Sequence, residues 1–406
     1  MDPARADPPE ARPPALSHAA LFVRFLKFGA MAFGGPVAQI AMIRRELVEE
    51  EGWIDGTRFN KLLAVMQVLP GPEAHELCVH LGIRARGRLS GILAGLGFML
   101  PGLLLMLALA WLYTRLQIDG TLLGAAFLGV QAAVLAVILR AVHRIGEHIL
   151  LDRWLWAAAI GAAAASFAGI SFWIVLPAAG AAYALASSRR YALAGLVVLA
   201  AGLFGFLLLA PPASVPEPAA VVSAEAAPTA AMLFWTGLKG GLLTFGGAYT
   251  AIPFIRDDTV GRGWMSDGQF LDGLGLSGIL PAPLVIFATF VGWISGGLAG
   301  ALAITAGMFL PAFAFSLIFY ERLEALAEHD RLHSILSGVA AGVVGLIAIT
   351  LVDLARTGAE RSPSLAASAA IFAAALLILY AWRSKAATPL VLALGAAAGA
   401  LTLGAG

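Results

Sequence analysis

Long apolar stretches follow one another along most of this chain, separated by short polar turns. A stretch of about 20 apolar residues is typical of a helix that crosses the ~30 Å hydrocarbon core of a bilayer. We therefore predict an all-α integral membrane protein with about thirteen spans. The first half has seven, near 19–43, 60–82, 89–114, 122–142, 154–168, 171–187 and 191–210. The second half has six, near 234–255, 268–291, 297–320, 333–354, 364–382 and 387–405.

Two segments without such a pattern divide the chain. Residues 1–18 are rich in Pro and Ala and lack an apolar core, which predicts a disordered tail and not a cleaved signal peptide. Residues 211–231 are again rich in Pro and Ala and lack Lys and Arg, as expected of a linker. The domains predicted from these boundaries are a first transporter repeat at 19–210 and a second at 232–406.

The two halves repeat each other. Phe33-Gly34-Gly35-Pro36 returns as Phe245-Gly246-Gly247-Ala248, and Pro70-Gly71-Pro72 returns as Pro281-Ala282-Pro283. Other pairs keep the same spacing, namely Trp53 and Trp264, Phe59 and Phe270, Pro101 and Pro311, and Gly129 and Gly338. A repeat at domain-scale spacing indicates duplication. Because the linker follows an odd number of predicted spans, we expect an inverted-topology repeat with a pseudo-twofold axis in the membrane plane.

Charge supports this arrangement. With the N-terminus in the cytoplasm, 17 Lys and Arg residues fall on cytoplasmic segments and 7 on the opposite side, in line with the positive-inside rule. The chain is 60% apolar and 13% charged, with a formal net charge of +1. Such a composition excludes an ordinary soluble domain and gives no sign of nucleic-acid binding.

Four helix breaks are the main functional candidates: Gly34-Gly35-Pro36, Pro70-Gly71-Pro72, Gly246-Gly247 and Pro281-Ala282-Pro283. Gly and Pro interrupt a helix, and the new helix that follows has unpaired N–H groups and about half a positive charge at its start. Such an end attracts an anion without a buried Lys or Arg. Broken helices in corresponding places of two halves indicate a transporter site. The alternative is that these residues only kink the helices or allow close packing.

Two lysines, Lys27 and Lys239, precede the Gly-Gly pairs at matching positions. They either add to an anion-attracting field or snorkel to the membrane surface. Gln67 precedes the first Pro-Gly-Pro and has an amide that could donate to an anion. Asp272, which aligns with Lys61, is expected at the membrane interface.

Glu73, His75 and Glu76 follow the Pro-Gly-Pro break in the first half alone. Glu73 would favour the positive start of the new helix, and a buried Glu76 could hold a coupling proton. The alternative is a satisfied polar cluster, or a pair with Arg84. Arg84 and Arg86 belong to a basic cytoplasmic turn, which either fixes orientation or concentrates an anion at the cytoplasmic mouth.

No soluble catalytic constellation appears in the sequence. There is no P-loop for ATP and no Cys/His spacing typical of zinc, and the seven His residues are dispersed. We therefore predict a non-enzyme that has no catalytic residues, no bound metal and no cofactor.

The set of Phe33-Gly34-Gly35-Pro36 and Leu69-Pro70-Gly71-Pro72, repeated in each half with Trp53, Phe59 and Leu100-Pro101, resembles the chromate ion transporter family in its long, two-domain form. The resemblance covers Phe22 to about Gly345. It implies chromate efflux, as in an antiporter that gives chromate resistance, across the bacterial inner membrane. The energy would come from the membrane potential or a proton gradient. Ala248 and Ala282 depart from the family pattern, so we expect the second-half site to be less sharply broken or mainly structural.

Three hypotheses follow. The first is a chromate exporter that works by alternating access, with the anion bound at broken-helix N-termini between the repeats. The second is a transporter of the same fold for sulfate or another small anion, since sulfate is nearly isosteric with chromate. The third is a membrane protein without a transport cycle. We expect membrane lipid to surround the spans, and the sequence does not decide whether a homodimer forms.

Overall fold

The chain folds into helices. A computed structural model describes residues 13–116, 118, 120–209, 227–321, 330–382, 384 and 386–404, and every regular element in these ranges is helical. Residues 1–12 of the predicted tail and 210–226 of the predicted linker lie outside the described residues. The first half contains α1 (His18–Ala30), α2 (Gly35–Arg44), the π-helix η1 (Arg45–Glu50), α3 (Gly56–Val68), α4 (Glu73–Arg86), α5 (Arg88–Arg115), α6 (Leu122–Ile149), α7 (Arg153–Phe167), α8 (Phe172–Ser187) and α9 (Tyr191–Leu209).

The second half follows the same order of helices. It contains α10 (Ala230–Leu242), η2 (Ala248–Ala251), α11 (Ile252–Thr259), α12 (Asp267–Ile279), η3 (Leu284–Ile286), α13 (Phe287–Ile318), α15 (Asp330–Arg361), α16 (Leu365–Ala381) and α17 (Ala387–Thr402). Gly296 and Gly297 leave helical geometry inside α13, so its two parts correspond to α4 and α5. Helix starts match as well, because Ser17 and Thr229 cap α1 and α10 with their hydroxyls.

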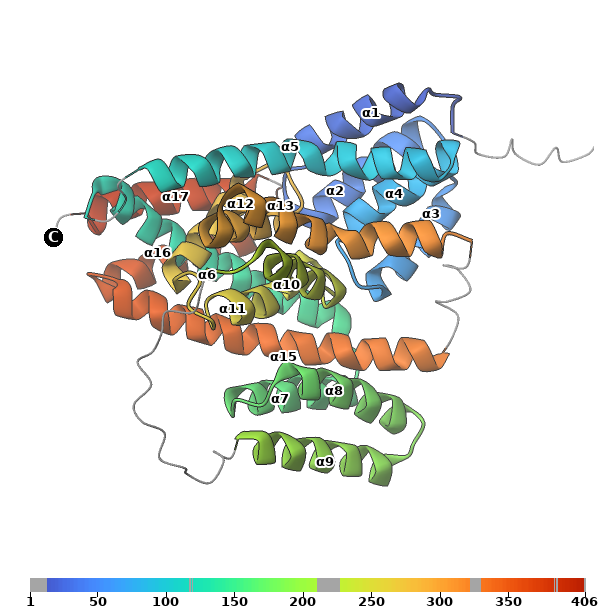
Figure 1. The fold of residues 1–406 in the computed structure, drawn as a ribbon. Helices are drawn as coiled ribbons and strands as arrows, with labels where there is room; N and C mark the ends of the chain where they lie inside the picture. Colours follow the sequence, from blue (N-terminus) through green and yellow to red (C-terminus); the bar gives the residue numbers. More distant parts are fainter. Residues whose placement is uncertain are drawn as a thin grey trace, which may run out of the picture.

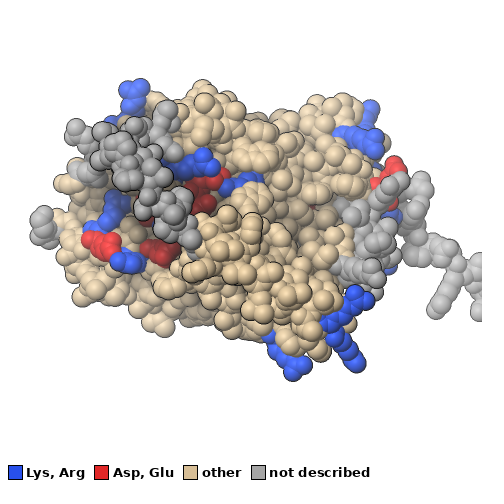
Figure 2. All heavy atoms as spheres, turned by 60° about the horizontal axis from the view of Figure 1, so that its bottom comes forward, with Lys and Arg blue, Asp and Glu red and all other residues tan. Residues whose placement is uncertain are grey.

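Within the part of the chain that the structure describes, five helices are long and apolar enough to cross a membrane. They cover Arg88–Arg115, Leu122–Ile149, Tyr191–Leu208, Leu284–Ile318 and Leu332–Arg361. Three shorter apolar helices are Phe172–Ser187, Leu365–Ala381 and Ala387–Thr402. The long helices run side by side along the molecule (Figure 1). In the face that Figure 2 shows, charged side chains form separate groups, one on the left that reaches toward the middle and others on the right, and most of the remaining visible surface carries no charge. These features are those of a multi-pass membrane protein.

The expected single span at 19–43 is wrong. Arg24 on α1 forms an ion pair with Glu51, which directly follows η1, and the Arg24 guanidinium lies 5.7 Å from the Trp53 ring. One continuous helix would separate residues 24 and 51 by about 40 Å. The chain therefore turns back at Gly34-Gly35, and α1 and α2 form a helical hairpin.

The expected single span at 60–82 is wrong for the same reason. Nε of Arg84, near the end of α4, donates to the carbonyl of Trp53 at 3.3 Å, although Trp53 lies before the start of α3. Residues 16–18 are at this end too, because His18 contacts Ser90 at 2.8 Å and Arg86 donates to the Leu16 carbonyl at 2.8 Å. An apolar stretch of a given length can form one membrane-spanning helix or two shorter helices in a hairpin. The length of the stretch alone therefore predicted a single span.

The second half has the same hairpins. Lys239 on α10 and Asp258 on α11 form an ion pair at 2.5 Å, so the chain turns back at Gly246-Gly247. Phe290 of α13 packs against Gly273 of α12, so it turns back at Pro281-Ala282-Pro283 as well. Each half therefore begins with two hairpins whose tips are the four predicted breaks.

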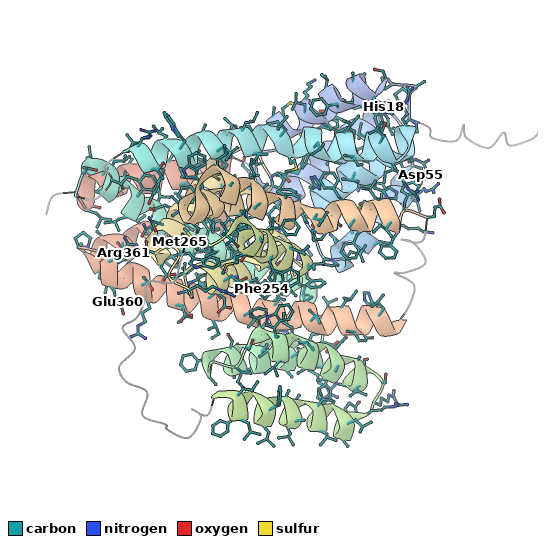
Figure 3. All side chains as sticks on the ribbon, viewed as in Figure 1. His18, Asp55, Phe254, Met265, Glu360 and Arg361 are labelled. Atoms are coloured by element: carbon teal, nitrogen blue, oxygen red, sulfur yellow. The ribbon has the colours of Figure 1, made fainter. Side chains whose placement is uncertain are left out.

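Corresponding helices of the two halves run antiparallel. Gly95 near the start of α5 packs against Phe313 near the end of α13, while Trp293 near the start of α13 donates to Thr114 near the end of α5 at 3.3 Å. Figure 3 shows the same relation for the connections that precede α3 and α12, because Asp55 and Met265 lie at opposite ends of the molecule.

Helices near the end of each half also pack against a long helix of the other half. Gly129 of α6 packs on the backbone of Gly395 and Gly399 of α17, and the repeat partner of Gly129, Gly338 of α15, packs on Ala179 and Gly180 of α8. Only residues without a Cβ permit such close approach of two helix backbones. Thus α17 of the second half packs on α6 of the first half, and α8 of the first half packs on α15 of the second.

Candidate functional site

All four predicted breaks are breaks in the structure. Helices end at Ala30, Val68, Leu242 and Ile279 before them. Gly34, Gly35, Gly71, Gly246 and Gly247 have φ angles of 91°, 77°, 146°, 69° and 136°. This region of backbone space is open to Gly at little steric cost, which explains why the sequence places Gly at these turns.

The tips of the hairpins meet across the two halves. The Gly71 N–H donates to the Thr244 carbonyl at 2.9 Å. The Gln39 side-chain amide donates to the carbonyl of Ala32 at 2.9 Å and to that of Ala282 at 3.0 Å. We call these five residues, Ala32, Gln39, Gly71, Thr244 and Ala282, the central junction. Each break of the first half therefore contacts one break of the second.

Two glycines pack tightly at the central junction. A Cβ built on Gly71 would lie 2.3 Å from Oε1 of Glu76, so a side chain there would displace that carboxyl group. A Cβ built on Gly102 of α5 would lie 2.3 Å from Cβ of Ala282, so a side chain there would push α5 and the tip at Ala282 apart.

Sequence reasoning missed Gln39. Its side chain is 1% exposed, and its Oε1 has no hydrogen-bond partner among the described residues. A signal was present, because Gln39 is a polar residue in an apolar segment, one turn after Pro36, and its repeat partner is Ala251.

Glu73, His75 and Glu76 are brought to the junction on the first turn of α4. Their exposed fractions are 7%, 0% and 1%. The His75 ring is surrounded by Phe98, Phe309 and Phe313. Among the described residues, neither ring nitrogen of His75 and neither carboxyl oxygen of Glu76 has a hydrogen-bond partner. The satisfied polar cluster that we considered for His75 and Glu76 is therefore not formed.

The two breaks of the Gly-Gly type differ in how their backbone groups are paired. In the second half, Thr250 Oγ1 accepts from the Phe245 N–H at 3.0 Å and donates to the Gly247 carbonyl at 2.6 Å. In the first half, Gly34 caps α2 without a side-chain hydrogen bond, and Phe33 is 42% exposed. Neither helix start has a side-chain cap, and the Phe33 N–H, which aligns with that of Phe245, donates to the Met31 carbonyl at 2.8 Å. The two breaks therefore differ mainly in accessibility, because Gly34 is exposed and Gly247 is buried.

The matched lysines lie in different surroundings. Lys239 is 6% exposed, pairs with Asp258 and lies 4.9 Å from the Phe172 ring. Lys27 is exposed on the last turn of α1. The structure therefore neutralises one lysine inside the protein and leaves the other at the surface.

The remaining predicted residues frame this region. Pro36 begins α2, Pro72 precedes α4, and Pro281 and Pro283 flank Ala282. Pro70 is buried beside Gly71, whereas the Gln67 side chain is exposed on α3. Arg84 and Arg86 lie at the end of α4 that is remote from the junction.

Asp272, which we expected at the membrane interface, is buried inside the protein. Its side chain is 4% exposed and accepts hydrogen bonds from Tyr113 and Gln131, both at 2.8 Å. Sequence spacing did not reveal these partners, because they come from α5 and α6 and have no fixed distance from α12 along the chain.

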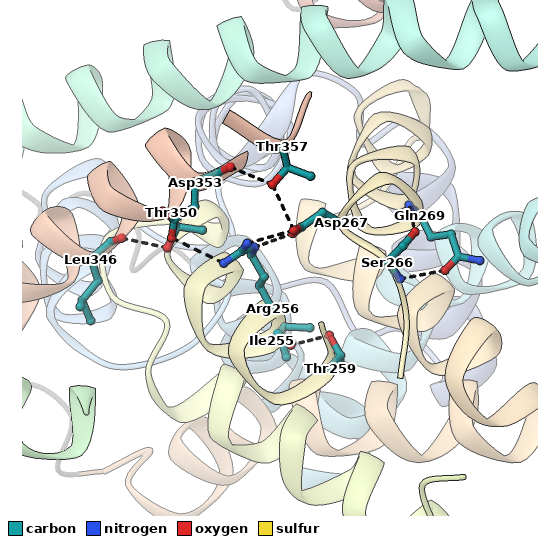
Figure 4. Close-up of polar contacts among 10 residues, drawn as sticks. All are labelled: Ile255, Arg256, Thr259, Ser266, Asp267, Gln269, Leu346, Thr350, Asp353 and Thr357. Carbon is teal, nitrogen blue, oxygen red and sulfur yellow. Dashed lines mark hydrogen bonds and ion pairs between the residues drawn. The ribbon is translucent and has the colours of Figure 1, made fainter. Parts of the chain in front are cut away.

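A charged network lies where α11 connects to α12. Arg256 donates to both carboxylate oxygens of Asp267, at 2.7 and 3.1 Å, and its Nη1 lies 3.7 Å from Asp353 of α15. Thr357 of α15 contacts Asp267 as well (Figure 4). The bidentate pair fixes the geometry between α11 and α12, and the longer contacts join both helices to α15.

Known proteins resemble this chain along nearly its whole length. The family model described as chromate transporter matches residues 19–206 and 231–400. A chromate transport protein of Pseudomonas aeruginosa is 66% identical over 379 residues, which cover 93% of this chain and 90% of the relative. A chromate transport protein of Cupriavidus metallidurans is 29% identical over 388 residues, covering 92% and 90%. A probable chromate transport protein of Synechococcus elongatus is 29% identical over 409 residues, covering 96% of both chains.

These relatives are named as transport proteins and not as enzymes. No solved structure gives a significant match. The family match covers both halves, including all four hairpin tips, and the resemblance expected from the repeated Gly and Pro motifs is confirmed. The chain belongs to the chromate transporter family.

Proposed function

We propose that this protein exports chromate from the bacterial cytoplasm by alternating access. The observation on which this rests is the contact of all four breaks at the central junction, where Gly71 meets Thr244 and Gln39 joins Ala32 to Ala282. Transporter sites lie near the middle of the membrane where broken helices of two repeats meet. Chromate binding between the tips would use the backbone N–H groups and positive ends of α2 and α4.

The two halves act as an inverted repeat in this proposal. The antiparallel α5 and α13 and the opposite positions of Asp55 and Met265 support it. The hairpins also improve the charge distribution. They move Arg44, Arg45, Arg58 and Lys61 to the cytoplasmic end and Arg256 and Arg262 to the other. The Lys and Arg count then becomes 19 against 5, instead of 17 against 7, so the positive-inside rule favours a cytoplasmic N-terminus more strongly.

The first break is the proposed point of anion contact. Its helix start at Gly34 has no side-chain cap and is exposed, whereas Gly247 at the second break is buried. The exposed Lys27 lies on the helix before this break. Arg84 and Arg86 lie at the cytoplasmic end of the same half, where they would raise the local concentration of a dianion. The second break holds the junction together and moves with it.

Glu76 is the proposed proton carrier, with Glu73 and His75 beside it. A buried carboxylate without a donor is costly, and protonation removes that cost. An anion bound at the adjacent Gly71 would repel the carboxylate, so chromate and a proton favour each other's binding. One chromate dianion carried with one proton moves a net negative charge outward, down the membrane potential. This electrostatic argument favours co-export over the antiport that the resemblance implies.

The decisive experiment is uptake of labelled chromate into inside-out membrane vesicles that contain the full chain. We expect accumulation that depends on the membrane potential and exceeds that of vesicles without the protein. Absence of such accumulation would contradict chromate export. Sulfate at equimolar concentration should compete weakly. Competition as strong as that of unlabelled chromate would instead favour the general oxyanion transporter.

A further inference from the structure

A second buried carboxyl group lies in the other half of the molecule, apart from the junction. Asp272 on α12 is 4% exposed and Gln131 on α6 is 5% exposed. The Gln131 amide donates to Oδ1 of Asp272, and the Tyr113 hydroxyl donates to Oδ2, both at 2.8 Å. Asp272 aligns with Lys61 of the first half, which is exposed. The repeat therefore does not require an acidic residue here.

The amide of Gln131 shows that this cluster has unused acceptor capacity. Its Nε2 lies near both Asp272 and the Gly268 carbonyl, the latter at 3.5 Å. Its Oε1 is buried and has no hydrogen-bond partner among the described residues. A buried acceptor without a donor is costly. A protonated Asp272 supplies such a donor, because its O–H can bond to Oε1 after the amide turns over.

The cluster lies on the side of the junction opposite to Glu76. Asp272 is one turn from Gly268, and the guanidinium of Arg361 packs directly against Gly268. Arg361 and Met265 lie at the same end of the molecule, while His18 and Asp55 lie at the other (Figure 3). With a cytoplasmic N-terminus, Asp272 is therefore nearer the outer face.

Neighbours of this carboxyl come from several elements. α5 contributes Tyr113, and α15 contributes Arg361 at Gly268. Asp267, earlier on α12, is paired with Arg256. α13 contributes Phe290, whose ring packs against Tyr113 at 5.0 Å. Hydroxyl and amide donors can hold either protonation state, which suits a group that gains and loses a proton during a cycle.

We propose that Asp272, with Tyr113 and Gln131, is a second proton-binding site, which exchanges protons with the outer side while Glu76 exchanges them with the cytoplasmic side. This inference rests on the proposed transport function and extends it, since it assigns the two carboxyl groups to opposite faces. A proton carried by the cycle would leave through the site of Asp272.

The test measures exchange of labelled for unlabelled chromate in inside-out vesicles, whose lumen faces the outer side of the protein. The pH of the lumen and that of the bath are varied separately. We expect Asp272→Asn to lose the response to lumenal pH and keep the response to bath pH, and Glu76→Gln to do the opposite. Lys61→Gln is the matched control at the repeat position and should keep both responses.

Tyr113→Phe sharpens the test. Loss of one donor weakens the stabilisation of the Asp272 carboxylate, so the midpoint of the lumenal response should move up by about 0.5 to 1 pH unit. A retained lumenal response in Asp272→Asn overturns the inference, and so does equal loss of both responses, which indicates a structural role. A lumenal response to Na⁺ in place of pH overturns it in favour of a sodium site. Wild-type vesicles that exchange no chromate would instead contradict the proposed function.

Discussion

The two halves of this protein share a scaffold but differ in the chemistry at their hairpin tips. After the first Pro-Gly-Pro, α4 begins with Glu73, Ala74, His75 and Glu76, whereas the aligned positions in the second half are Leu284, Val285, Ile286 and Phe287. All eight side chains are buried. The two halves thus have matching backbones at this point. Titratable side chains occupy the positions in the first half, and apolar side chains occupy them in the second.

The same division appears at the Gly-Gly tips. Gly34 of the first tip is exposed, whereas Gly247 of the second is buried and Thr250 holds the turn around it. Alternating access needs one part of the molecule that binds the substrate and another that stays rigid enough to move as a unit. The comparison assigns binding to the first half and rigidity to the second. Substitutions at aligned positions of the two halves test that assignment.

The largest expected contrast is between Phe287→Gln and Glu76→Gln. Phe287 is fully buried, and replacing its ring with an amide should lower the free energy of unfolding by about 3 to 5 kcal/mol. Glu76 makes no side-chain hydrogen bond in the described structure, so Glu76→Gln should change stability by less than about 1 kcal/mol. It should nevertheless remove the dependence of chromate exchange on bath pH.

Thermal unfolding in detergent measures the first effect, and exchange in vesicles measures the second. Glu49→Gln, on an exposed residue, is the control for loss of an acidic group. Equal destabilisation by both substitutions at the aligned positions would contradict the assignment, because it would mean that Glu76 is part of the packing.

Lys239→Ala should have the next largest effect. It removes the partner that lies 2.5 Å from the buried Asp258. Loss of one member of a buried pair costs about 3 to 5 kcal/mol, and we expect the lower value because Arg262 remains 3.6 Å from Asp258. The double variant Lys239→Ala/Asp258→Ala should recover part of this loss, as measured by thermal unfolding. A single variant as stable as the wild type would show that the pair contributes nothing.

A smaller effect is expected from exchanging the caps of the two Gly-Gly tips. Thr250→Val removes two buried hydrogen bonds and should cost about 1 to 2 kcal/mol of stability, while Thr250→Ser should restore it. Ala38 occupies the aligned position in the first half, and Ala38→Thr should place a branched, polar side chain at the start of α2. We expect that variant to fold normally and to show a severalfold higher KM for chromate. An unchanged KM would mean that the start of α2 does not contact the anion.

The sequence was sufficient for the breaks and the repeat but not for the path of the chain. Gly and Pro at Gly34-Gly35-Pro36 and Pro70-Gly71-Pro72 have a backbone preference that acts locally, so the helix ends could be predicted. Whether the chain then crosses or turns back depends on contacts such as that between Arg24 and Glu51, whose spacing follows no helical or strand period. The count of Lys and Arg is consistent with the hairpins, because they place more of these residues at the end of the molecule that carries the N-terminus.

The partners of the site residues were harder to predict than the residues themselves. Equal spacing suggested equal roles for Lys27 and Lys239, but in the described structure Lys239 is buried and paired with Asp258 of the facing helix, whereas Lys27 is exposed. Gln39 and Asp272 act through residues of the opposite half, and the sequence of one half has no local signal for such contacts. Burial of a polar side chain is a tertiary property, and it is what distinguishes these residues from others of the same type.

The smallest expected effect is that of Lys27→Ala. Lys27 is exposed, so its removal should leave the midpoint of thermal unfolding unchanged, in contrast to Lys239→Ala. An exposed charge attracts a dianion through water, where screening limits its contribution to less than about 1 kcal/mol. We therefore expect a two- to fivefold increase in the KM for chromate at low ionic strength, which disappears at high salt. Lys61→Ala, another exposed lysine of the same half, should leave the KM unchanged. If Lys27→Ala changes neither KM nor its salt dependence, this lysine anchors α1 at the membrane surface, and the anion is attracted by the helix starts alone.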